Sequence, residues 1–462
     1  MFRLDKNFLV FKKNEKLKNI LTKIKKFIFK NNRPIIFVVD DKNKCVGTVT
    51  DGDIRRFIEK NLNLNTYIYN ISRKDFVYVY YDDPENKILR AFEKLNNKRG
   101  KYLAIPVLKK NHQIEGILDY EDYISSFFIK RKIIRARIPA RVSFSGGGTD
   151  FSDIFTNNES QVLSSTINKF STISLLLRSD NKVNIINRSM KSSIKINHFN
   201  QIEKVKGGLI LECLRLLKPK FGFDLEILSD FESGTGLGGS SSIAVAILAV
   251  FNELESNNKM DLNLICNLAY QAERINLGIK GGWQDFFSTA YGGFNWIELD
   301  NKDIIVNPLR IPEETINELE HNLMLFRIGK TRSSSLIQKK IIKKNYKKSN
   351  FIKIKEISKE MKKCLLRGKV KQFGDLLDIS WVLKKKFSPF SSNKKIDKIY
   401  EVIKKNGALG GKLLGAGQSG YLLVYSSPTY QGKIKNELKK LGAKFENLRF
   451  VNSGLKTWTT ER

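Results

Sequence analysis

The most informative segment of this 462-residue chain is Ser233-Gly-Thr-Gly-Leu-Gly-Gly-Ser-Ser-Ser242, which leads directly into the apolar segment Ile243-Ala-Val-Ala-Ile-Leu-Ala-Val-Phe251. Apolar side chains surround the second segment on nearly every side, so we expect a buried helix. Glycines allow backbone N–H groups to line a concave loop, and a helix N-terminus adds a positive partial charge. Together they predict a phosphate cradle, with a glycine-rich cap on a buried helix as the alternative. The spacing is neither that of a Walker A loop nor that of a dinucleotide-binding GxGxxG.

Two further glycine-rich segments lie on either side of this one. The first is Arg137-Ile-Pro-Ala-Arg-Val-Ser-Phe-Ser-Gly-Gly-Gly-Thr-Asp150, and the last is Gly410-Gly-Lys-Leu-Leu-Gly-Ala-Gly-Gln-Ser-Gly420. The first predicts a strand that ends in a turn where a ligand can approach the backbone, and the last predicts a glycine turn that feeds an apolar strand. The short acceptors Thr149 and Asp150 then face that gap and could hold a substrate hydroxyl.

Two carboxylates lie between the second and third glycine-rich segments. An apolar stripe places Glu273 beside the buried face of a helix, near its end; the stripe consists of Leu264, Ile265, Leu268, Ala269, Ala272 and Ile275. Glycines at 278, 281 and 282 break this helix, and a second one is predicted to begin near Gln284-Asp285. A surface ion pair for Glu273 and a helix-dipole partner for Asp285 are the alternatives to catalytic roles.

Taken in order, the three glycine-rich segments resemble the GHMP kinase superfamily of galactokinase, homoserine, mevalonate and phosphomevalonate kinases. The resemblance covers residues 133–462, and its middle motif is specific, although the usual first Ser is Gly239 here. It implies an α+β kinase of two subdomains. These are an ATP-binding N-terminal subdomain at 133–320, like ribosomal protein S5, and a ferredoxin-like C-terminal subdomain at 321–462.

The resemblance also implies ATP and Mg²⁺ as cofactors and assigns roles to residues. Ser240 and Glu273 would contact Mg²⁺, and Asp285 would take the proton of the substrate hydroxyl. Arg141 falls near the transferred phosphoryl group, where it would fix the base or stabilise charge, with a surface arginine as the alternative. The residues implied to bind ATP are Gly234, Gly236, Leu237, Gly238, Gly239, Ser240 and Ser241.

Details of the first segment resemble one branch, the D-glycero-D-manno-heptose 7-phosphate kinases, as do Lys330-Thr-Arg-Ser-Ser-Ser335 and Ser380-Trp-Val-Leu-Lys-Lys385. This branch implies phosphorylation of the anomeric hydroxyl of the sugar phosphate, upstream of nucleotide-heptose and surface polysaccharide synthesis. A kinase for an unphosphorylated, fucose- or galactose-like sugar and a non-catalytic nucleotide sensor are the alternatives. The residues implied to bind the substrate are Gly147, Gly148, Thr149, Asp150, Thr331, Arg332, Gly415, Ala416 and Gly417.

An internal repeat occupies the N-terminal region. The pattern of strand, polar turn, strand and helix start over 36–53 recurs at 105–122, at a constant offset of 69 residues. The pair resembles a tandem CBS module, which we place at 1–128. The resemblance implies an adenine nucleotide at Thr50 and Asp53, or else a scaffolding role that includes a homodimer through the pair. Capping of the following helix is the alternative for Asp53.

Composition sets outer limits on function. The chain has 82 basic and 47 acidic residues, for a net charge of +35, and its lysines are spread along the chain, as at 384–386. We therefore predict solvated lysines on every surface rather than a nucleic-acid-binding patch. The four cysteines form no CxxC pair, and no apolar run reaches the roughly 18–20 residues of a membrane span. These features predict a cytoplasmic protein without a signal peptide or a membrane partner.

Overall fold

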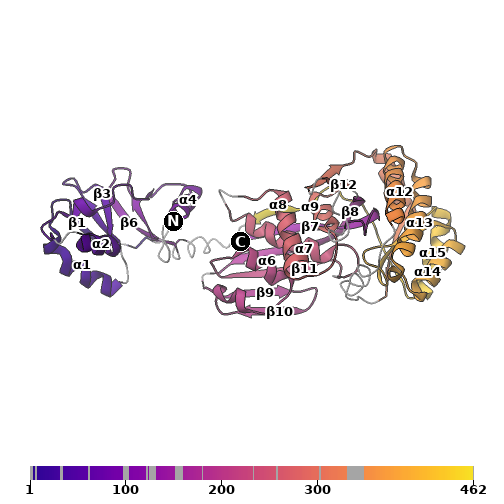
Figure 1. The fold of residues 1–462 in the computed structure, drawn as a ribbon, viewed down its shortest axis with the longest axis horizontal. Helices are drawn as coiled ribbons and strands as arrows, with labels where there is room; N and C mark the ends of the chain where they lie inside the picture. The colour runs from indigo at the N-terminus through magenta and orange to yellow at the C-terminus, as the bar shows by residue number, and fades with distance from the viewer. Residues whose placement is uncertain are drawn as a thin grey trace. The chain divides into compact units, whose positions relative to one another are not determined.

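The computed structural model describes residues 4–5, 8–31, 35–60, 63–96, 104–120, 123, 132–150, 160–178, 180–232, 234–255, 259–300, 303–329 and 348–460. The chain divides into two compact units. One consists of residues 1–131 with 256–258, and the other of residues 132–255 with 259–462. Both are drawn as ribbons in Figure 1.

The N-terminal unit contains the same small fold twice. Strands β1, β2 and β3 form one three-stranded sheet, and β4, β5 and β6 form another, each with one parallel and one antiparallel pair. Strands β5 and β6 begin and end 69 residues after β2 and β3, which confirms the predicted repeat. The elements are β1 (Leu9–Lys12), α1 (Leu17–Asn31), β2 (Ile35–Val39), β3 (Cys45–Thr50), α2 (Asp51–Lys60), α3 (Ile68–Ile71), β4 (Val79–Tyr80), α4 (Glu85–Asn96), β5 (Ala104–Leu108) and β6 (Ile114–Asp119).

The two copies contact each other through the turns of their antiparallel hairpins. The Cys45 N–H donates to the His112 carbonyl at 2.9 Å, and Lys44 forms a β-bridge with Gln113. Phe37 of the first copy shares a small buried cluster with Ile117 of the second. The repeat is therefore a packed pair rather than two independent sheets.

An eight-stranded sheet forms the first part of the second unit. Its order is β10-β9-β11-β8-β12-β13, and β7 pairs with both β8 and β18. Helix α7 packs on β7 and β8, and these elements lie together in Figure 1. The strands are β7 (Ile133–Ser145), β8 (Gln161–Leu177), β9 (Val183–Asn187), β10 (Ser192–Ile196), β11 (Phe223–Ser229), β12 (Phe294–Asp300), β13 (Asp303–Pro308) and β18 (Lys456–Thr460). The helices are η1 (Phe199–Lys204), α6 (Leu209–Leu217), α7 (Gly239–Asn252), α8 (Leu262–Tyr270), the π-helical turn η2 (Gln271–Asn276) and α9 (Gln284–Tyr291).

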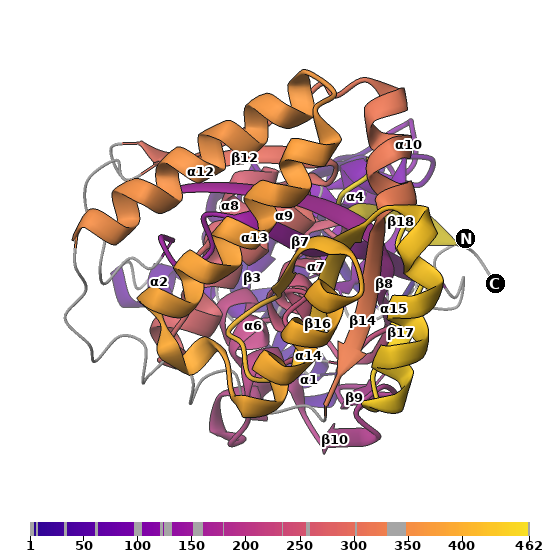
Figure 2. The ribbon, with the colours of Figure 1, turned by 90° about the vertical axis from the view of Figure 1, so that its right-hand side faces the viewer.

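A four-stranded antiparallel sheet, in the order β15-β16-β14-β17, forms the rest of this unit. Along the chain its strands follow the β-α-β-β-α-β pattern of ferredoxin-like folds, except that the helices α12, α13 and α14 all lie between β14 and β15. Helices α12 and α13 lie side by side, while α14 and α15 contact each other over the sheet (Figure 2). The elements are α10 (Glu313–Asn322), β14 (Leu323–Ile328), α12 (Lys348–Leu366), α13 (Val370–Phe387), η3 (Pro389–Ser391), α14 (Lys394–Lys405), β15 (Ala408–Leu413), β16 (Gly420–Ser426), α15 (Pro428–Lys440) and β17 (Lys444–Glu446).

One apolar core runs through both halves of the second unit. Phe144 of β7 and Trp296 of β12 belong to the same buried cluster as Phe373 of α13 and Leu423 of β16. The core therefore holds the two glycine-bearing sheets in a fixed relation, which matters for the site described below.

The structure confirms the α+β class and the burial of α7, in which every residue except Ser240 is buried. It corrects the apolar stripe: Leu264 and Ile275 are 46% and 65% exposed, so the inward face of this segment is narrower than the sequence suggested. Among the described helices, none combines the length and the apolar character needed to cross a membrane. The domain limits at 1–128, 133–320 and 321–462 stay predictions.

Candidate active site

The three glycine-rich segments meet although they are far apart in the sequence. A Cβ atom on Gly415 would lie 2.3 Å from the Cα atom of Gly236, and both glycines have positive φ, +67° and +88°. The first segment joins them through β7, where the Arg141 N–H donates to the Leu237 carbonyl at 3.1 Å. Because neither glycine carries a side chain, the backbone of one loop packs directly on that of the other.

Arg141 and Asp285 form an ion pair at this meeting point. The Arg141 Nε–H donates to Asp285 Oδ1 at 2.8 Å, a second bond to the same oxygen comes from Nη2, and Nη1 donates to the Gly236 carbonyl. The two side chains are 3% and 20% exposed. The alternative of a surface arginine is wrong. Because Asp285 lies in the first turn of α9, the helix fixes its carboxylate beside the second glycine-rich loop.

Glu273 lies beside the N-terminus of α7, where it contacts two serines. Its Oε1 accepts a hydrogen bond from Ser240 at 2.7 Å and its Oε2 accepts one from Ser241 at 2.8 Å. The residue is only 2% exposed and sits in the π-helical turn, in which the Leu277 N–H reaches the Ala272 carbonyl at 3.3 Å. Such turns widen a helix locally and are frequent at functional sites. Glu273 does form an ion pair, with Arg274 Nη2 at 3.6 Å, but both side chains are buried, so only the surface position of that alternative is wrong.

The oxygen atoms of this group fit a magnesium ion. Mg²⁺ prefers carboxylate and hydroxyl oxygens and takes few of its ligands from protein, because phosphate oxygens and water supply the others. Ser240 Oγ and Glu273 Oε1 are close enough for both to reach one ion. Across the described part of the chain, no three His, Cys, Asp or Glu residues gather into a metal site.

Asp150 is buried beneath the first glycine-rich turn. Its Oδ1 accepts from the Gly148 N–H at 2.9 Å and its Oδ2 from the Gln284 N–H at 3.3 Å. Burial and the nearby carboxylate of Asp285 raise the pKa of Asp150, although these two N–H groups act in the opposite direction. Thr149 does not face the gap freely, since its hydroxyl donates to the Gly146 carbonyl at 2.7 Å and closes the turn.

Sequence reasoning missed two polar side chains beside this turn. Ser143 Oγ and Gln284 Oε1 are buried and accept or donate no hydrogen bond within the described residues. They lie 3.2 Å and 3.7 Å from the point that a Cβ atom of Gly147 would occupy. Unsatisfied buried polar atoms are rare and often face a ligand. In the sequence, the only sign that Gln284 could belong to the site was its position directly before Asp285.

Two lysines near the site were also missed. The Lys384 ammonium donates to the carbonyls of Leu413 and Gly415, at 3.1 Å and 2.6 Å. The Lys412 ammonium donates to the carbonyls of Ser143 and Phe144, at 3.1 Å and 2.9 Å. Burial lowers the pKa of both groups, that of Lys384 to about 8. The prediction of solvated lysines over 384–386 is therefore wrong for the first of the three.

The remaining predicted substrate residues divide into two groups. Ala416 and Gly417 follow Gly415 in the third loop, where a Cβ atom on Gly417 would lie 2.2 Å from the Ser391 carbonyl oxygen. Thr331 and Arg332 lie outside the described residues. The third loop is thus held between η3 and the second glycine-rich segment.

Thr50 and Asp53 belong to the other unit and bond each other. The Thr50 hydroxyl donates to Asp53 Oδ2 at 2.6 Å, and the Asp53 N–H donates back to Thr50 Oγ1 at 3.2 Å. Arg56 and Arg73 bond Asp53 Oδ1, at 2.7 Å and 2.8 Å. The reciprocal pair caps the start of α2, as the alternative for Asp53 proposed.

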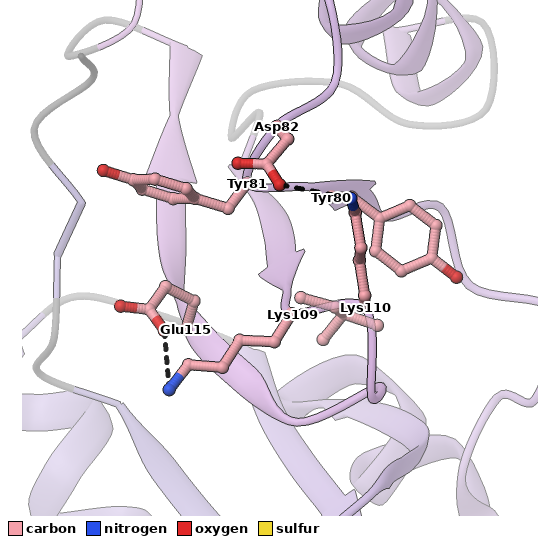
Figure 3. Close-up of a pocket in the computed structure, with 7 residues that line it drawn as sticks. Tyr80, Tyr81, Asp82, Lys109, Lys110 and Glu115 are labelled. Carbon is pink, nitrogen blue, oxygen red and sulfur yellow. Dashed lines mark ion pairs between the residues drawn. The ribbon is translucent and has the colours of Figure 1, made fainter.

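The same unit has a pocket of about 370 Å³ at the turn end of β5 and β6 (Figure 3). Two ion pairs cross its wall, Lys109 with Glu115 at 3.2 Å and Lys110 with Asp82 at 3.8 Å. Asp119, the counterpart of Thr50 in the repeat, ends β6 at the far end of that strand. Neither Thr50 nor Asp53 is among the residues that line the pocket.

Family models match both units. The model of the GHMP kinases N terminal domain matches residues 208–293, and that of the GHMP kinases C terminal domain matches residues 361–444. The CBS domain model matches twice, at 4–60 and 68–128.

Individual relatives agree with these models. The chain is 32% identical over 337 residues to a D-glycero-alpha-D-manno-heptose 7-phosphate kinase of Campylobacter jejuni, covering 71% of this chain and 99% of the relative. It is 27% identical to the crystal structure of a D-glycero-D-manno-heptose 1-phosphate kinase from Bacteroides thetaiotaomicron, with a TM-score of 0.58 over 70% of this chain and 98% of that one. A galactokinase of Thermotoga petrophila is 24% identical over 66% of this chain and 93% of its own length.

Proposed function

Because this chain belongs to the GHMP kinases and carries two CBS domains at its N-terminus, we propose that it transfers the γ-phosphoryl group of ATP to the anomeric hydroxyl of D-glycero-D-manno-heptose 7-phosphate. The observation that carries the choice of substrate is the 32% identity to the Campylobacter jejuni enzyme over nearly its whole length. The product would be a precursor of nucleotide-activated heptose for surface polysaccharide. On this proposal the kinase works in the cytoplasm.

Asp285 would accept the proton of the attacking hydroxyl. Phosphoryl transfer requires positioning and charge neutralisation more than covalent chemistry. The bond from Arg141 to Asp285 Oδ1 leaves Oδ2 of the same carboxylate free of that partner, and α9 holds the group in place. Arg141 would thus orient the base and add positive charge near the transferred group.

The nucleotide phosphates would lie on the loop at 234–239 and at the N-terminus of α7, where backbone N–H groups and the helix dipole favour anions. Ser240 and Glu273 would hold Mg²⁺, which neutralises phosphate charge when bound. Ser241 bonds the second oxygen of Glu273 at 2.8 Å and would keep its carboxylate oriented. This assignment depends on the oxygen atoms around Glu273 and not on the family alone.

The acceptor sugar would lie over the first glycine-rich turn. Asp150, Ser143 and Gln284 bring a carboxylate and two unsatisfied polar atoms to this place. Such groups recognise hydroxyls well, because a sugar that lacks the hydroxyl leaves them unpaired. A substrate rich in hydroxyl groups therefore fits the turn better than an apolar one.

An assay of ADP release over a panel of acceptors tests the proposal. We expect the highest kcat/KM with the heptose 7-phosphate and a much lower value with unphosphorylated fucose, galactose and heptose. A higher kcat/KM with an unphosphorylated sugar would identify that sugar as the substrate instead. Absence of turnover with every acceptor would favour the alternative of a non-catalytic nucleotide sensor.

For the CBS pair we propose an adenine nucleotide at Thr50 and Asp53, in a module that also joins two chains. The Arg56 and Arg73 side chains already bonded to Asp53 would supply positive charge for phosphates. Titration of the full chain with AMP, ADP and ATP should raise its melting temperature, and Thr50→Val should remove the increase. Sedimentation of the same samples reports dimer formation. If Thr50→Val leaves the nucleotide effect unchanged, this site is wrong.

A further inference from the structure

Three consecutive lysines at the end of α13 face three different surroundings. Lys386 is exposed, and Lys385 forms an ion pair with Asp397 at 3.0 Å. Lys384 instead points inward, because it follows the buried residues Leu377 and Trp381 at helical spacing. Of these three consecutive residues, only Lys384 therefore lies at the candidate active site.

Lys384 is connected to the catalytic group by direct contacts. Its ammonium bonds the Gly415 carbonyl at 2.6 Å, and Gly415 packs on Gly236. The Gly236 carbonyl in turn accepts from Arg141, the partner of Asp285. Lys384 therefore lies where the second and third glycine-rich loops meet.

The charge on Lys384 has only neutral hydrogen-bond partners. Within the described residues, no carboxylate lies at ion-pair distance from its ammonium, whereas Arg141 has Asp285 and Lys385 has Asp397. An ammonium has three donors, and the carbonyls of Leu413 and Gly415 occupy two of them. The nearby charges do not balance that of Lys384, because the Arg141 guanidinium lowers its pKa while the more weakly acting Asp150 carboxylate raises it. A buried charge that is not fully compensated is unfavourable, and an anion that approached the third donor would reduce this cost.

Lys412 provides an internal comparison. It too bonds two carbonyls, those of Ser143 and Phe144, but it is only 3% exposed and lies inside the contact between β15 and β7. Lys384 is partly exposed as a whole residue, although its ammonium lies deep enough for burial to lower its pKa. The two lysines thus have the same kind of partners, and access separates a structural role from a binding role.

We propose that the Lys384 ammonium binds a phosphoryl group of a substrate at the junction of the second and third glycine-rich loops, while Lys412 only joins β15 to β7. The inference rests on the proposed kinase function. The phosphoryl group has two sources, the γ-phosphoryl group of ATP and the phosphate already on the acceptor sugar, and both present the same anionic oxygens.

Steady-state kinetics of Lys384→Met, with Lys386→Met as the matched control, separates the two sources. Loss of a charge-assisted hydrogen bond should lower kcat/KM by about 10- to 100-fold. An equal loss of kcat with phosphorylated and unphosphorylated acceptors assigns Lys384 to the γ-phosphoryl group. A rise in KM that is confined to the phosphorylated acceptor assigns it to the acceptor phosphate. Kinetics like those of Lys386→Met with every acceptor would overturn the proposal.

A binding measurement keeps this inference distinct from the kinase proposal. Inorganic phosphate should protect the full chain and Lys386→Met against thermal unfolding, and should protect Lys384→Met much less. This holds even if no sugar is turned over, a result that would reject the kinase function alone. Equal protection of all three proteins, or none for the unsubstituted chain, would overturn the inference. Lys384→Gln, which can still donate to one carbonyl, replaces the Met variant if that variant fails to fold.

Discussion

Replacing Asp285 with Asn tests the catalytic assignment most directly. The change keeps the shape of the side chain and an oxygen that can still accept from Arg141, but removes the negative charge. Loss of a general base typically lowers kcat by about 10²–10⁴-fold. ATP binding should change little, because the loop at 234–239 and Glu273 are untouched.

The same substitution has a predictable effect on stability. Breaking a buried ion pair by removing one partner costs about 3–5 kcal/mol, because the other charge is left buried. Arg141 is 3% exposed, but Asp285 is 20% exposed and Asn retains an acceptor for the 2.8 Å bond. We therefore expect a smaller loss, about 1–3 kcal/mol, which is measurable as a lower denaturation midpoint in urea.

The assay combines ADP release, ATP titration and urea unfolding for Asp285→Asn, Arg141→Met and the double variant. Coupling between the two sites should make the double variant more stable than the sum of the single losses predicts. Most of the wild-type activity in Asp285→Asn would refute the base assignment. Additive stability losses would refute the argument from the buried ion pair, and loss of ATP binding would show that Asp285 acts on the nucleotide loop instead.

Three further outcomes are expected. Gly415 has φ +67°, and a Cβ atom there would lie 2.3 Å from the Cα atom of Gly236, so Gly415→Ala should lower the free energy of unfolding by more than about 1 kcal/mol and weaken ATP binding. Gly432 has open space around it, and Gly432→Ala should have neither effect. Urea unfolding and ATP titration of both variants check this prediction. Glu273→Gln should raise the Mg²⁺ concentration needed for half-maximal activity by about tenfold or more, while the surface change Glu360→Gln leaves it unaltered. Burial lowers the pKa of Lys384 to about 8, from 10.5 in the unfolded chain. Between these two pH values the unfolded chain binds more protons than the folded chain, so the contribution of Lys384 to the free energy of unfolding should rise with pH. Urea titrations at several pH values should show a smaller rise for Lys384→Met, and an identical slope would contradict the argument.

Local patterns in the sequence predicted the framework of both units. The 69-residue offset placed two equivalent hairpins, and the structure shows β2–β3 and β5–β6 at that spacing. The apolar run after Ser242 predicted a buried helix, which α7 confirms. Patterns of this kind depend on neighbours in the sequence, and local physical chemistry is sufficient to interpret them.

The pairings within the candidate site depend on tertiary structure and could be predicted only in part. Arg141 is 144 residues from Asp285, so nothing local distinguishes it from a surface arginine. Periodicity did predict Glu273 near a buried face, but not the two serine hydroxyls that bond it. Lys384 was missed because a run of lysines suggests solvent, although its spacing from Trp381 matches the buried face of α13.

The contact between Gly236 and Gly415 has a consequence for genetics. A substitution that overfills a packed core can be relieved by a second change that trims a neighbouring side chain. Here both partners are already glycine, and each also has a backbone conformation that other residues rarely adopt. A selection for second-site suppressors of Gly236→Ala should therefore recover revertants at 236 but no compensating substitution at 415.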